Sequence, residues 1–313
     1  MTLALHSSAR ACGKIILLGE HAVVHGQPAL AAGLPDALSL HARELADRRA
    51  PIRLSIAAWD LAITLDGDSD HPVARACIEV LSHCDGPLTG WAIDGIANIP
   101  ARAGLGSSAA LTVALARLAL GTEAAHDDLV QASLAGERIF HGTPSGIDTE
   151  VAVRGGVLRY VRGEPAEAIA LQRALPLVVV PSGVPRSTAD QVQKVHRAVD
   201  RWPMLARPMI ELVGRLVDLG QDAMIKGDLP RLGELADLDH ALLTGLGVSS
   251  WILDELCYVA RGAGALGAKL TGAGGGGCIL ALPSGDPTPL LAAFHHRQLR
   301  PLCFSIGPAN EEP

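Results

Sequence analysis

A run of glycines near the C-terminal end constrains the fold more than any other feature of this sequence. Residues 272–277 read Gly-Ala-Gly-Gly-Gly-Gly, and they lie between two segments, 267–271 and 278–282, that are typical of short strands. Glycine loses more backbone entropy on folding than any other residue, and a plain turn needs only one or two. The run therefore predicts two strands joined by a loop whose backbone closely approaches a ligand or another loop.

A second glycine-rich segment, Gly104-Leu105-Gly106-Ser107-Ser108, follows a predicted strand over 91–99 and opens an Ala/Leu-rich helix predicted over about 109–120. Glycines let the backbone wrap around a ligand, and the first N–H groups of a helix attract anions. The two serines can equally well cap the helix. The segment by itself therefore leaves both an anion site and an ordinary N-cap open.

Several other motif matches are excluded by their context. Segments starting at Gly262 and Gly272 match G-x-G-x-x-G, but each precedes a strand, whereas the dinucleotide motif needs a helix after its glycines. The sequence contains no G-x-x-x-x-G-K-[ST], which excludes a P-loop enzyme. His21 and His25 lie close to Glu20, but the flanking glycines favour a loop over the helical pair of a zinc site.

Predicted strands and helices follow one another irregularly along the chain. Strands are predicted at 14–18, 29–34, 38–43, 52–56, 91–99, 175–180, 267–271, 278–282 and 302–306, with a strand pair over 151–161. Helices are predicted at 72–84, 109–120, 127–140, 188–199, 207–226, 229–243, 250–262 and 287–298. Without a regular βαβ alternation the fold class is α+β. A polar stretch at 162–167 precedes a buried strand, so we expect two domains, 1–171 and 172–313.

Composition excludes several classes of protein. Hydrophobic residues make up 49% of the 313 residues, which is enough for a sizeable core. The net charge of −7 argues against a nucleic acid or an anionic membrane as the partner. No apolar run approaches the roughly 18 to 20 residues that cross a bilayer, and no signal peptide is evident. Six cysteines without a C-x-x-C pair are typical of reduced thiols, so we expect a cytoplasmic protein.

Three charged residues lie in apolar or glycine-rich surroundings. Lys14 precedes an apolar run and is one of only four lysines, Glu137 lies late in a predicted helix, and Asp148 lies in a turn with Pro144 and Gly146. Each also has an ordinary structural interpretation. The lysine can reach solvent from a strand end, the glutamate can pair with a neighbouring arginine, and the aspartate can cap the turn.

Four segments, taken together and in this order, resemble the GHMP family of small-molecule kinases and, within it, the mevalonate kinases. They are residues 14–26, 99–110, 136–148 and 269–278, and segments 185–188 and 243–256 are also similar. The resemblance extends over about residues 13–307. It implies a ribosomal-S5-like N-terminal domain and a ferredoxin-like C-terminal domain, with the active site between them.

The resemblance also implies a reaction and its residues. The γ-phosphate of ATP, with Mg²⁺ bound, would be transferred to the C5 hydroxyl of mevalonate. Asp148 matches the catalytic aspartate and Lys14 the lysine beside it, while Ser108 and Glu137 match the Mg²⁺ ligands. The ATP phosphates would lie on Gly104, Leu105, Gly106, Ser107, Ser108 and Ala109. The substrate-binding positions would be Glu20, His21, Arg159, Thr188, Gly272 and Ala273.

This chain departs from the family pattern in two places. Ala101 and Arg102 stand where proline and glycine are common, and the region 43–90, which helps to shape the adenine pocket, is short. We expect Arg102 to point to solvent. A phosphomevalonate kinase, a mevalonate 3-kinase, a sugar kinase, the related diphosphomevalonate decarboxylase and an inactive sensor remain alternatives. A homodimer is common among similar proteins, and no nucleic acid or membrane partner is expected.

Overall fold

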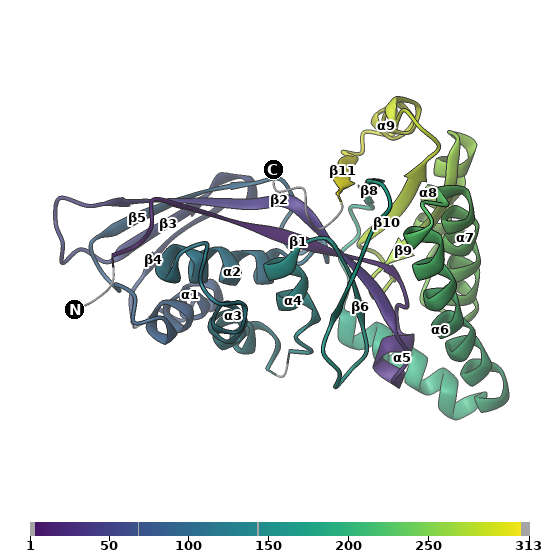
Figure 1. Cartoon of the computed structure of the whole chain (residues 1–313), viewed down its shortest axis with the longest axis horizontal. Coiled ribbons are helices and arrows are strands. Elements are labelled where there is room, and N and C mark those ends of the chain that lie inside the picture. Colours follow the sequence, from purple (N-terminus) through teal and green to yellow (C-terminus); the bar gives the residue numbers. More distant parts are fainter. Residues whose placement is uncertain (1–3, 68, 143, 308–313) are drawn as a thin grey trace. The chain divides into compact units, whose positions relative to one another are not determined.

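The computed structural model describes residues 4–67, 69–142 and 144–307, and the chain divides into two compact units (Figure 1). The first unit comprises residues 1–14 and 34–155, and the second comprises 15–33 and 156–313. This division differs from the two continuous domains that we expected. Two long strands, β1 (Ser8–Leu18) and β2 (Ala29–Glu44), each begin in one unit and end in the other, and residues 156–171 belong to the second unit.

The first unit is built on a sheet whose strands follow the order β4-β3-β5-β2. Strands β3 (Ile52–Ile56) and β5 (Trp91–Ala97) run parallel, whereas β4 (Leu61–Leu65) and β2 pair antiparallel to their neighbours. Strand β3 turns one face to the core, because Ile52, Leu54 and Ile56 are buried while the residues between them face solvent. A single turn of 3₁₀ helix, Ala57–Trp59, joins β3 to β4.

Four helices pack together beside this sheet and complete the core of the first unit (Figure 1). They are α1 (Pro72–His83), α2 (Ser107–Leu120), α3 (His126–His141) and α4 (Ile147–Arg154). Helix α2 is rich in alanine and leucine and is buried almost all around. Gly136 lets α3 approach closely, since a Cβ there would lie 2.7 Å from side-chain atoms of both Thr112 and Val80.

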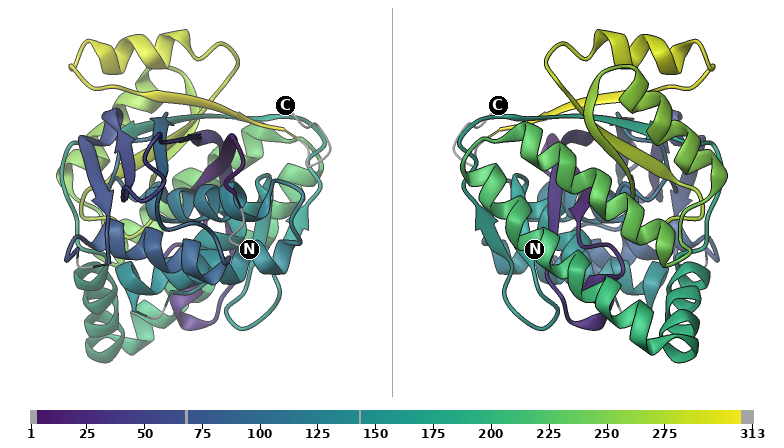
Figure 2. Two further views of the ribbon diagram at one scale, coloured as in Figure 1. Left: turned by 90° about the vertical axis from the view of Figure 1, so that its left-hand side faces the viewer. Right: turned by 90° about the vertical axis from the view of Figure 1, so that its right-hand side faces the viewer.

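The second unit contains a four-stranded antiparallel sheet in the order β11-β8-β10-β9 (Figures 1 and 2). Its strands are β8 (Leu175–Pro181), β9 (Ala265–Thr271), β10 (Cys278–Pro283) and β11 (Leu302–Ile306). Its helices are α5 (Thr188–Arg201), α6 (Pro203–Ile225), α7 (Leu229–Gly245), α8 (Trp251–Gly262) and α9 (Thr288–His295). Helices α7 and α8 pack on β9, and two short strands, β6 (Val157–Tyr160) and β7 (Glu167–Ile169), extend from the first part of β2.

The mixed helices and sheets confirm the α+β class, but three local predictions were wrong. The strand pair predicted over 151–161 is a helix, α4, followed by one strand, β6. Gly146 adopts a left-handed conformation that starts the helix, and burial of Val151 and Val153 outweighs their strand preference. The segments 29–34 and 38–43 form the single strand β2, and β4 and β7 were not predicted.

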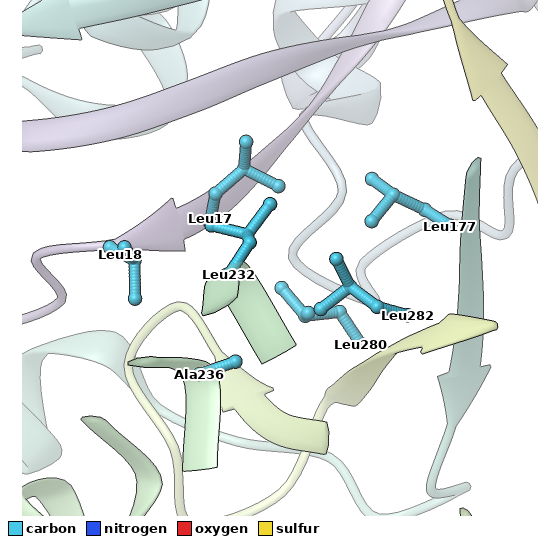
Figure 3. A pocket seen from close by; sticks show the side chains of 7 residues that line it. All are labelled: Leu17, Leu18, Leu177, Leu232, Ala236, Leu280 and Leu282. Atoms are coloured by element: carbon cyan, nitrogen blue, oxygen red, sulfur yellow. The ribbon is translucent and has the colours of Figure 1, made fainter. Parts of the chain in front are cut away.

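A small cavity lies in the second unit, lined only by leucine and alanine side chains (Figure 3). The lining residues are Leu17, Leu18, Leu177, Leu232, Ala236, Leu280 and Leu282. Its volume of about 10 Å³ leaves room for no more than one water molecule, which would find no polar side chain there. The cavity is therefore a packing defect of the core. None of the described helices is long and apolar enough to cross a membrane.

Helix α7 and strand β9 approach each other so closely that glycine is required on both. A Cβ at Gly233 would lie 2.5 Å from the Leu266 backbone, and one at Gly267 would lie 2.0 Å from the Gly233 carbonyl oxygen. We expect Gly233→Ala to lower the free energy of unfolding by about 1–3 kcal/mol through overpacking. Urea denaturation measures this change.

The matched control is Gly262→Ala at the last position of α8, where a Cβ would meet no atom within 4 Å. That substitution should stabilise the protein by up to about 1 kcal/mol, because alanine has the higher helix propensity. Equal effects at the two positions would contradict the close approach as the reason for Gly233.

Candidate active site

An ion pair between Lys14 and Asp148 forms the centre of the candidate site in the first unit. The Lys14 Nζ lies 2.9 Å from Asp148 Oδ1, and the side chains are 10% and 33% exposed. Lys14 lies on β1, and Asp148 lies in the first turn of α4, where a carboxylate is stabilised by the helix dipole. The structure thus brings together a nearly buried ammonium and a carboxylate that retains access to solvent.

The segment 104–108 adjoins this pair through the backbone. The Lys14 N–H donates to the Leu105 carbonyl at 2.8 Å, and a Cβ at Gly106 would lie 2.9 Å from the Lys14 nitrogen. Gly106 has a φ of 74° and is the N-cap of α2, so only glycine adopts this conformation without strain. The loop therefore packs directly on the strand that carries the ammonium.

Neither serine caps helix α2, so the ordinary N-cap, one of the two interpretations that the sequence left open, is not realised. Ser107 and Ser108 are the first two residues of the helix, and no side chain caps it. The Ser107 Oγ instead accepts a hydrogen bond from the Arg102 N–H, and Arg102 is exposed as expected. An uncapped helix N-terminus behind a glycine loop suits a bound anion such as a phosphate.

Ser108 and Glu137 face each other across the packed pair α2 and α3. The Ser108 Oγ donates to Glu137 Oε2 at 3.4 Å, and the His141 Nε2 lies 3.4 Å from the same hydroxyl. Burial, reinforced by the charge of Asp148, raises the pKa of Glu137 to about 7. Because ionising this carboxylate is costly, a nearby cation would stabilise its charged form.

The oxygen atoms of Ser108 and Glu137 are suited to a divalent cation. The Glu137 Oε1 is buried and has no hydrogen-bond partner among the described residues, so it has an open coordination position. A hydroxyl and a carboxylate are hard ligands of the kind that Mg²⁺ binds, and Mg²⁺ takes few ligands from protein when phosphates supply the rest. Within the described part of the chain no cluster of three His, Cys, Asp or Glu side chains offers a metal site made by protein alone.

The glycine run of the second unit packs against neighbouring backbone. The Gly275 N–H donates to the Val248 carbonyl at 2.7 Å, and the Gly277 N–H donates to the Val184 carbonyl at 2.9 Å. A Cβ at Gly274 would lie only 2.2 Å from that Val248 oxygen. Of the two explanations that the sequence offered for so many glycines, close approach to another loop is thus realised here.

His21 meets this loop at Ala273. The His21 Nε2 lies 2.9 Å from the Ala273 carbonyl, and because a carbonyl only accepts, Nε2 carries the hydrogen. Burial lowers the pKa of His21, so the neutral ring is favoured. The Arg186 guanidinium approaches Gly272 and Thr271 from the segment before α5, and its charge also contributes to the lowered pKa of His21. A neutral imidazole and a cation therefore border the loop.

The other predicted substrate residues have different surroundings. Glu20 is fully buried and forms an ion pair with Lys269, so its carboxylate faces the interior of the second unit. Arg159 forms an ion pair with Asp218 on α6 at 3.1 Å. Thr188 is exposed and is the first residue of α5. Of the predicted substrate positions, His21 and Ala273 are joined by a hydrogen bond, and Gly272 directly precedes Ala273 in the loop.

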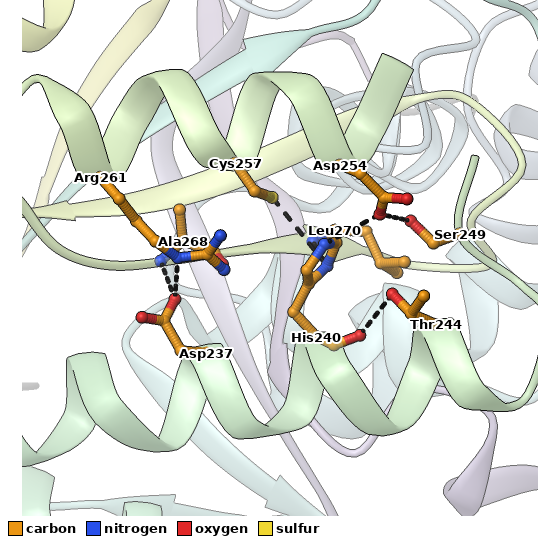
Figure 4. Close-up of polar contacts among 9 residues, drawn as sticks. All are labelled: Asp237, His240, Thr244, Ser249, Asp254, Cys257, Arg261, Ala268 and Leu270. Atoms are coloured by element: carbon orange, nitrogen blue, oxygen red, sulfur yellow. Dashed lines mark hydrogen bonds and ion pairs between the residues drawn. The ribbon is translucent and has the colours of Figure 1, made fainter. Parts of the chain in front are cut away.

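Side chains of helix α7 bind the backbone of strand β9, which directly precedes the glycine loop in the sequence (Figure 4). The Asp237 Oδ1 accepts the Ala268 N–H at 2.9 Å, and the His240 Nδ1 accepts the Leu270 N–H at 3.2 Å. Arg261 of α8 donates to Asp237 and to the Ala268 carbonyl. Because Nδ1 accepts, the neutral form of His240 carries its hydrogen on Nε2, which lies 3.1 Å from Asp254.

Sequence reasoning missed three residues of these surroundings. His141 reads as an exposed residue at a helix end, and Arg186 as one of many arginines. Lys269 entered the sequence analysis only as the first residue of the segment 269–278, although it is completely buried. The scarcity of lysine is the one signal in the sequence that distinguishes it, since both Lys14 and Lys269 are buried while Lys194 and Lys226 are exposed.

Comparisons with known proteins identify the family to which the chain is similar. Residues 72–156 match the family model for the N-terminal domain of GHMP kinases, and residues 221–297 match that for the GHMP kinase C-terminal region. The mevalonate kinase of Pyrococcus abyssi is 37% identical over 91% of both chains, and that of Bos taurus is 32% identical over 86% of this chain and 84% of its own. The crystal structure of L. major mevalonate kinase in complex with R-mevalonate has a TM-score of 0.82 at 27% identity, covering 97% of this chain and 96% of its own.

The bond between His240 and Leu270 makes the stability of the second unit dependent on pH. Burial lowers the pKa of His240 below its ordinary value of 6.5, so the unfolded chain binds the proton more readily than the folded one. Stability is therefore lost as the pH falls through about 6.5, by at most about 1.4 kcal/mol per pH unit for this group. We expect His240→Gln, which can keep both hydrogen bonds but cannot titrate, to lose less stability than the wild type on acidification.

Urea denaturation at several pH values between about 5 and 8 measures this difference. His83→Gln, at the exposed end of α1, is the matched control and should follow the wild type. An identical acid loss in the His240 variant and the wild type would contradict the assignment.

Proposed function

The chain belongs to the GHMP kinase family, and we propose that it is a mevalonate kinase, which transfers the γ-phosphate of ATP to the C5 hydroxyl of mevalonate. The single observation that carries the proposal is the ion pair of Lys14 and Asp148 beside the uncapped start of α2. Identity of 37% to a mevalonate kinase over 91% of both chains supports this choice of substrate among GHMP activities.

Asp148 acts as the general base in this proposal. Its carboxylate takes the proton of the C5 hydroxyl while the hydroxyl oxygen bonds to the γ-phosphorus and the bond from that phosphorus to the ADP oxygen breaks. The Lys14 ammonium, 2.9 Å from Asp148, stabilises the negative charge that develops on the entering oxygen. A compact ammonium suits this position better than a planar guanidinium, although most basic residues of this chain are arginines.

The phosphates of ATP are assigned to the segment 104–109. The N–H groups in the first turn of α2, which no side chain caps, and the partial positive charge of the helix end suit the β- and γ-phosphates. Because the same segment contacts the Lys14 backbone, a phosphate held there lies beside the ion pair. This assignment is supported by the missing side-chain cap of the helix.

Mg²⁺ is assigned to Ser108 and Glu137. When bound, the ion supplies charge neutralisation for the transferred phosphoryl group. The protein contributes a hydroxyl and a carboxylate whose Oε1 has no described hydrogen-bond partner. The ion would also compensate the burial of Glu137, whose proton it would displace.

Mevalonate binding is assigned to the second unit, at His21, Thr188, Gly272 and Ala273. The nearby Arg186 guanidinium provides the positive charge that a carboxylate substrate requires. Glu20 and Arg159 are engaged with Lys269 and Asp218, so we assign them no direct contact with the substrate. Sequence similarity alone had suggested both.

We further propose a cytoplasmic location and a homodimer. None of the six cysteines forms a disulfide, which is typical of a reducing compartment. The homodimer is supported by exposed apolar side chains along α6, namely Leu205, Leu212 and Leu219, which recur every seven residues on one side of the helix. Light scattering after gel filtration tests the dimer directly.

Asp148→Ala should lower kcat by at least about 10²-fold, because the proton of the hydroxyl loses its acceptor. The measurement is ADP release with mevalonate, and NMR of the product reads the position of the new phosphate. Asp128→Ala is the matched control, since Asp128 is an exposed aspartate in the first turn of α3. Near-normal turnover of the Asp148 variant would remove this residue from the mechanism.

The same assay with phosphomevalonate, galactose and homoserine tests the choice of substrate. We expect kcat/KM to be highest for mevalonate, with no release of carbon dioxide from diphosphomevalonate. A preference of at least about tenfold for another acceptor would assign the chain to a different GHMP activity.

Glu137→Gln should weaken the binding of ATP in the presence of Mg²⁺ by at least about tenfold, because the neutral amide is a poor ligand for a hard cation. Thermal unfolding with ATP and either Mg²⁺ or EDTA measures this binding without turnover. The wild type should gain more from ATP with Mg²⁺ than with EDTA, and the variant should show no such difference. An equal Mg²⁺-dependent gain in both proteins would contradict the metal assignment.

A further inference from the structure

A cluster of three charged side chains is completely buried in the second unit. Lys269 of β9 forms ion pairs with Glu20, from the segment before the 3₁₀ turn Ala22–His25, and with Asp239 of α7. The side chains of all three have no exposed surface, and the distance from Lys269 Nζ to Asp239 Oδ2 is 3.2 Å. None of them takes part in the reaction as described above.

The cluster holds two carboxylates and one ammonium. Glu20 Oε2 and Asp239 Oδ1 have no hydrogen-bond partner among the described residues. Without a bound proton the cluster carries a net negative charge away from water, which is costly. Burial, and after it the charge of Asp239, raises the pKa of Glu20 to about 8 against the pull of Lys269. The cluster is therefore neutral when Glu20 keeps its proton.

Three contacts join the segment 16–21 to the segment 269–273. The Thr271 hydroxyl donates to the Ile16 carbonyl at 2.8 Å, Lys269 holds Glu20, and His21 donates to the Ala273 carbonyl. Of these, only the bond between Lys269 and Glu20 joins two ionisable side chains. The bond between Lys269 and Glu20 lies directly before His21, which is the N-cap residue of the 3₁₀ turn Ala22–His25.

His21 itself has a conformation that needs support. Its φ of 61° lies in the left-handed region, which a non-glycine residue occupies at a cost of about 1–3 kcal/mol. It is 5% exposed, and the turn that follows it is a single 3₁₀ turn. Glu20 directly precedes His21 and connects it to the core through its bond to Lys269.

The anchor is rigid on its other side as well. Asp239 lies on α7 between Asp237 and His240, which hold the N–H groups of Ala268 and Leu270 on either side of Lys269. Three nearby positions of one helix thus fix three successive residues of β9. Lys269 is held in place before it reaches Glu20.

We propose that Lys269 and Asp239 are positioning residues that, through Glu20, hold the His21 turn and the glycine loop 272–277 in the geometry that binds mevalonate. This inference rests on the proposed function. It also gives Glu20 a role different from that of a substrate ligand, because its carboxyl group points into the core and serves as a tether.

The pair Glu20→Gln and Glu20→Ala separates a tether from a ligand. Glutamine resembles the protonated carboxyl and can still accept a hydrogen bond from Lys269, whereas alanine releases the turn and leaves Lys269 paired with Asp239. We expect the KM for mevalonate to stay within about threefold of wild type in the glutamine variant and to rise at least about tenfold in the alanine variant. The KM for ATP should change in neither. If glutamine is as damaging as alanine, Glu20 is a ligand and the proposal is wrong.

Lys269→Met tests the positioning residue directly, with Lys226→Met, an exposed lysine after α6, as the matched control. We expect the KM for mevalonate to rise at least about tenfold in the first variant, with the KM for ATP and the thermal gain from ATP with Mg²⁺ unchanged. The control should equal the wild type. A folded Lys269 variant with a normal KM for mevalonate would overturn the inference.

Asp239→Asn keeps the test decisive if Lys269→Met does not fold, because it leaves a balanced pair of Glu20 and Lys269. In the wild type, loss of the proton from Glu20 above about pH 8 leaves two carboxylates on one ammonium, so the KM for mevalonate should rise there. Glu20→Gln and Asp239→Asn should both flatten this alkaline rise. A rise as steep as that of the wild type in both variants would overturn the inference. A wild type that does not phosphorylate mevalonate would instead overturn the proposed function.

Discussion

The ion pair between Lys14 and Asp148 constrains the whole first unit. An ammonium that is only 10% exposed is tolerable because a carboxylate lies 2.9 Å away, and removing Asp148 would leave that ammonium without its partner. The strand that carries Lys14 also receives the loop before α2, through its N–H and the space that Gly106 leaves. Strand, loop and helix α4 are therefore fixed relative to one another by the groups that the proposed chemistry uses.

The second unit also buries a lysine, but with two carboxylates instead of one. Lys269 is fully buried against two carboxylates, so a proton completes the neutral state. Its position is supported by α7, and the glycine run that follows β9 packs on the backbone of Val184 and Val248. Glycine is needed there because neighbouring carbonyl groups occupy the space of a side chain. The loop geometry that borders His21 thus depends on the interior of the unit.

Local patterns predicted much of the fold, and contacts between distant segments account for the rest. The alternation of apolar and polar residues in Ile52–Ile56 predicts that strand well. Apolar residues that recur at helical spacing predict α6, α7 and α8 equally well. Helix α4 was missed because its valines are typical of a strand, and only their burial within the first unit decides otherwise. Lys14 and Asp148 were recognised through the family resemblance, since no spacing rule connects them. The burial of Lys269 could not be predicted, because its partners Glu20 and Asp239 come from remote parts of the chain.

Strand β9 forms the outer edge of its sheet, and this has a consequence for how copies of the protein behave together. Its outward N–H groups at Ala268 and Leu270 are occupied by Asp237 and His240, and the Ala268 carbonyl is occupied by Arg261. An additional strand from another molecule would find these ladder positions filled. Side chains of helices α7 and α8 therefore cap the outer edge of β9, which keeps further strands from adding to the sheet on this side.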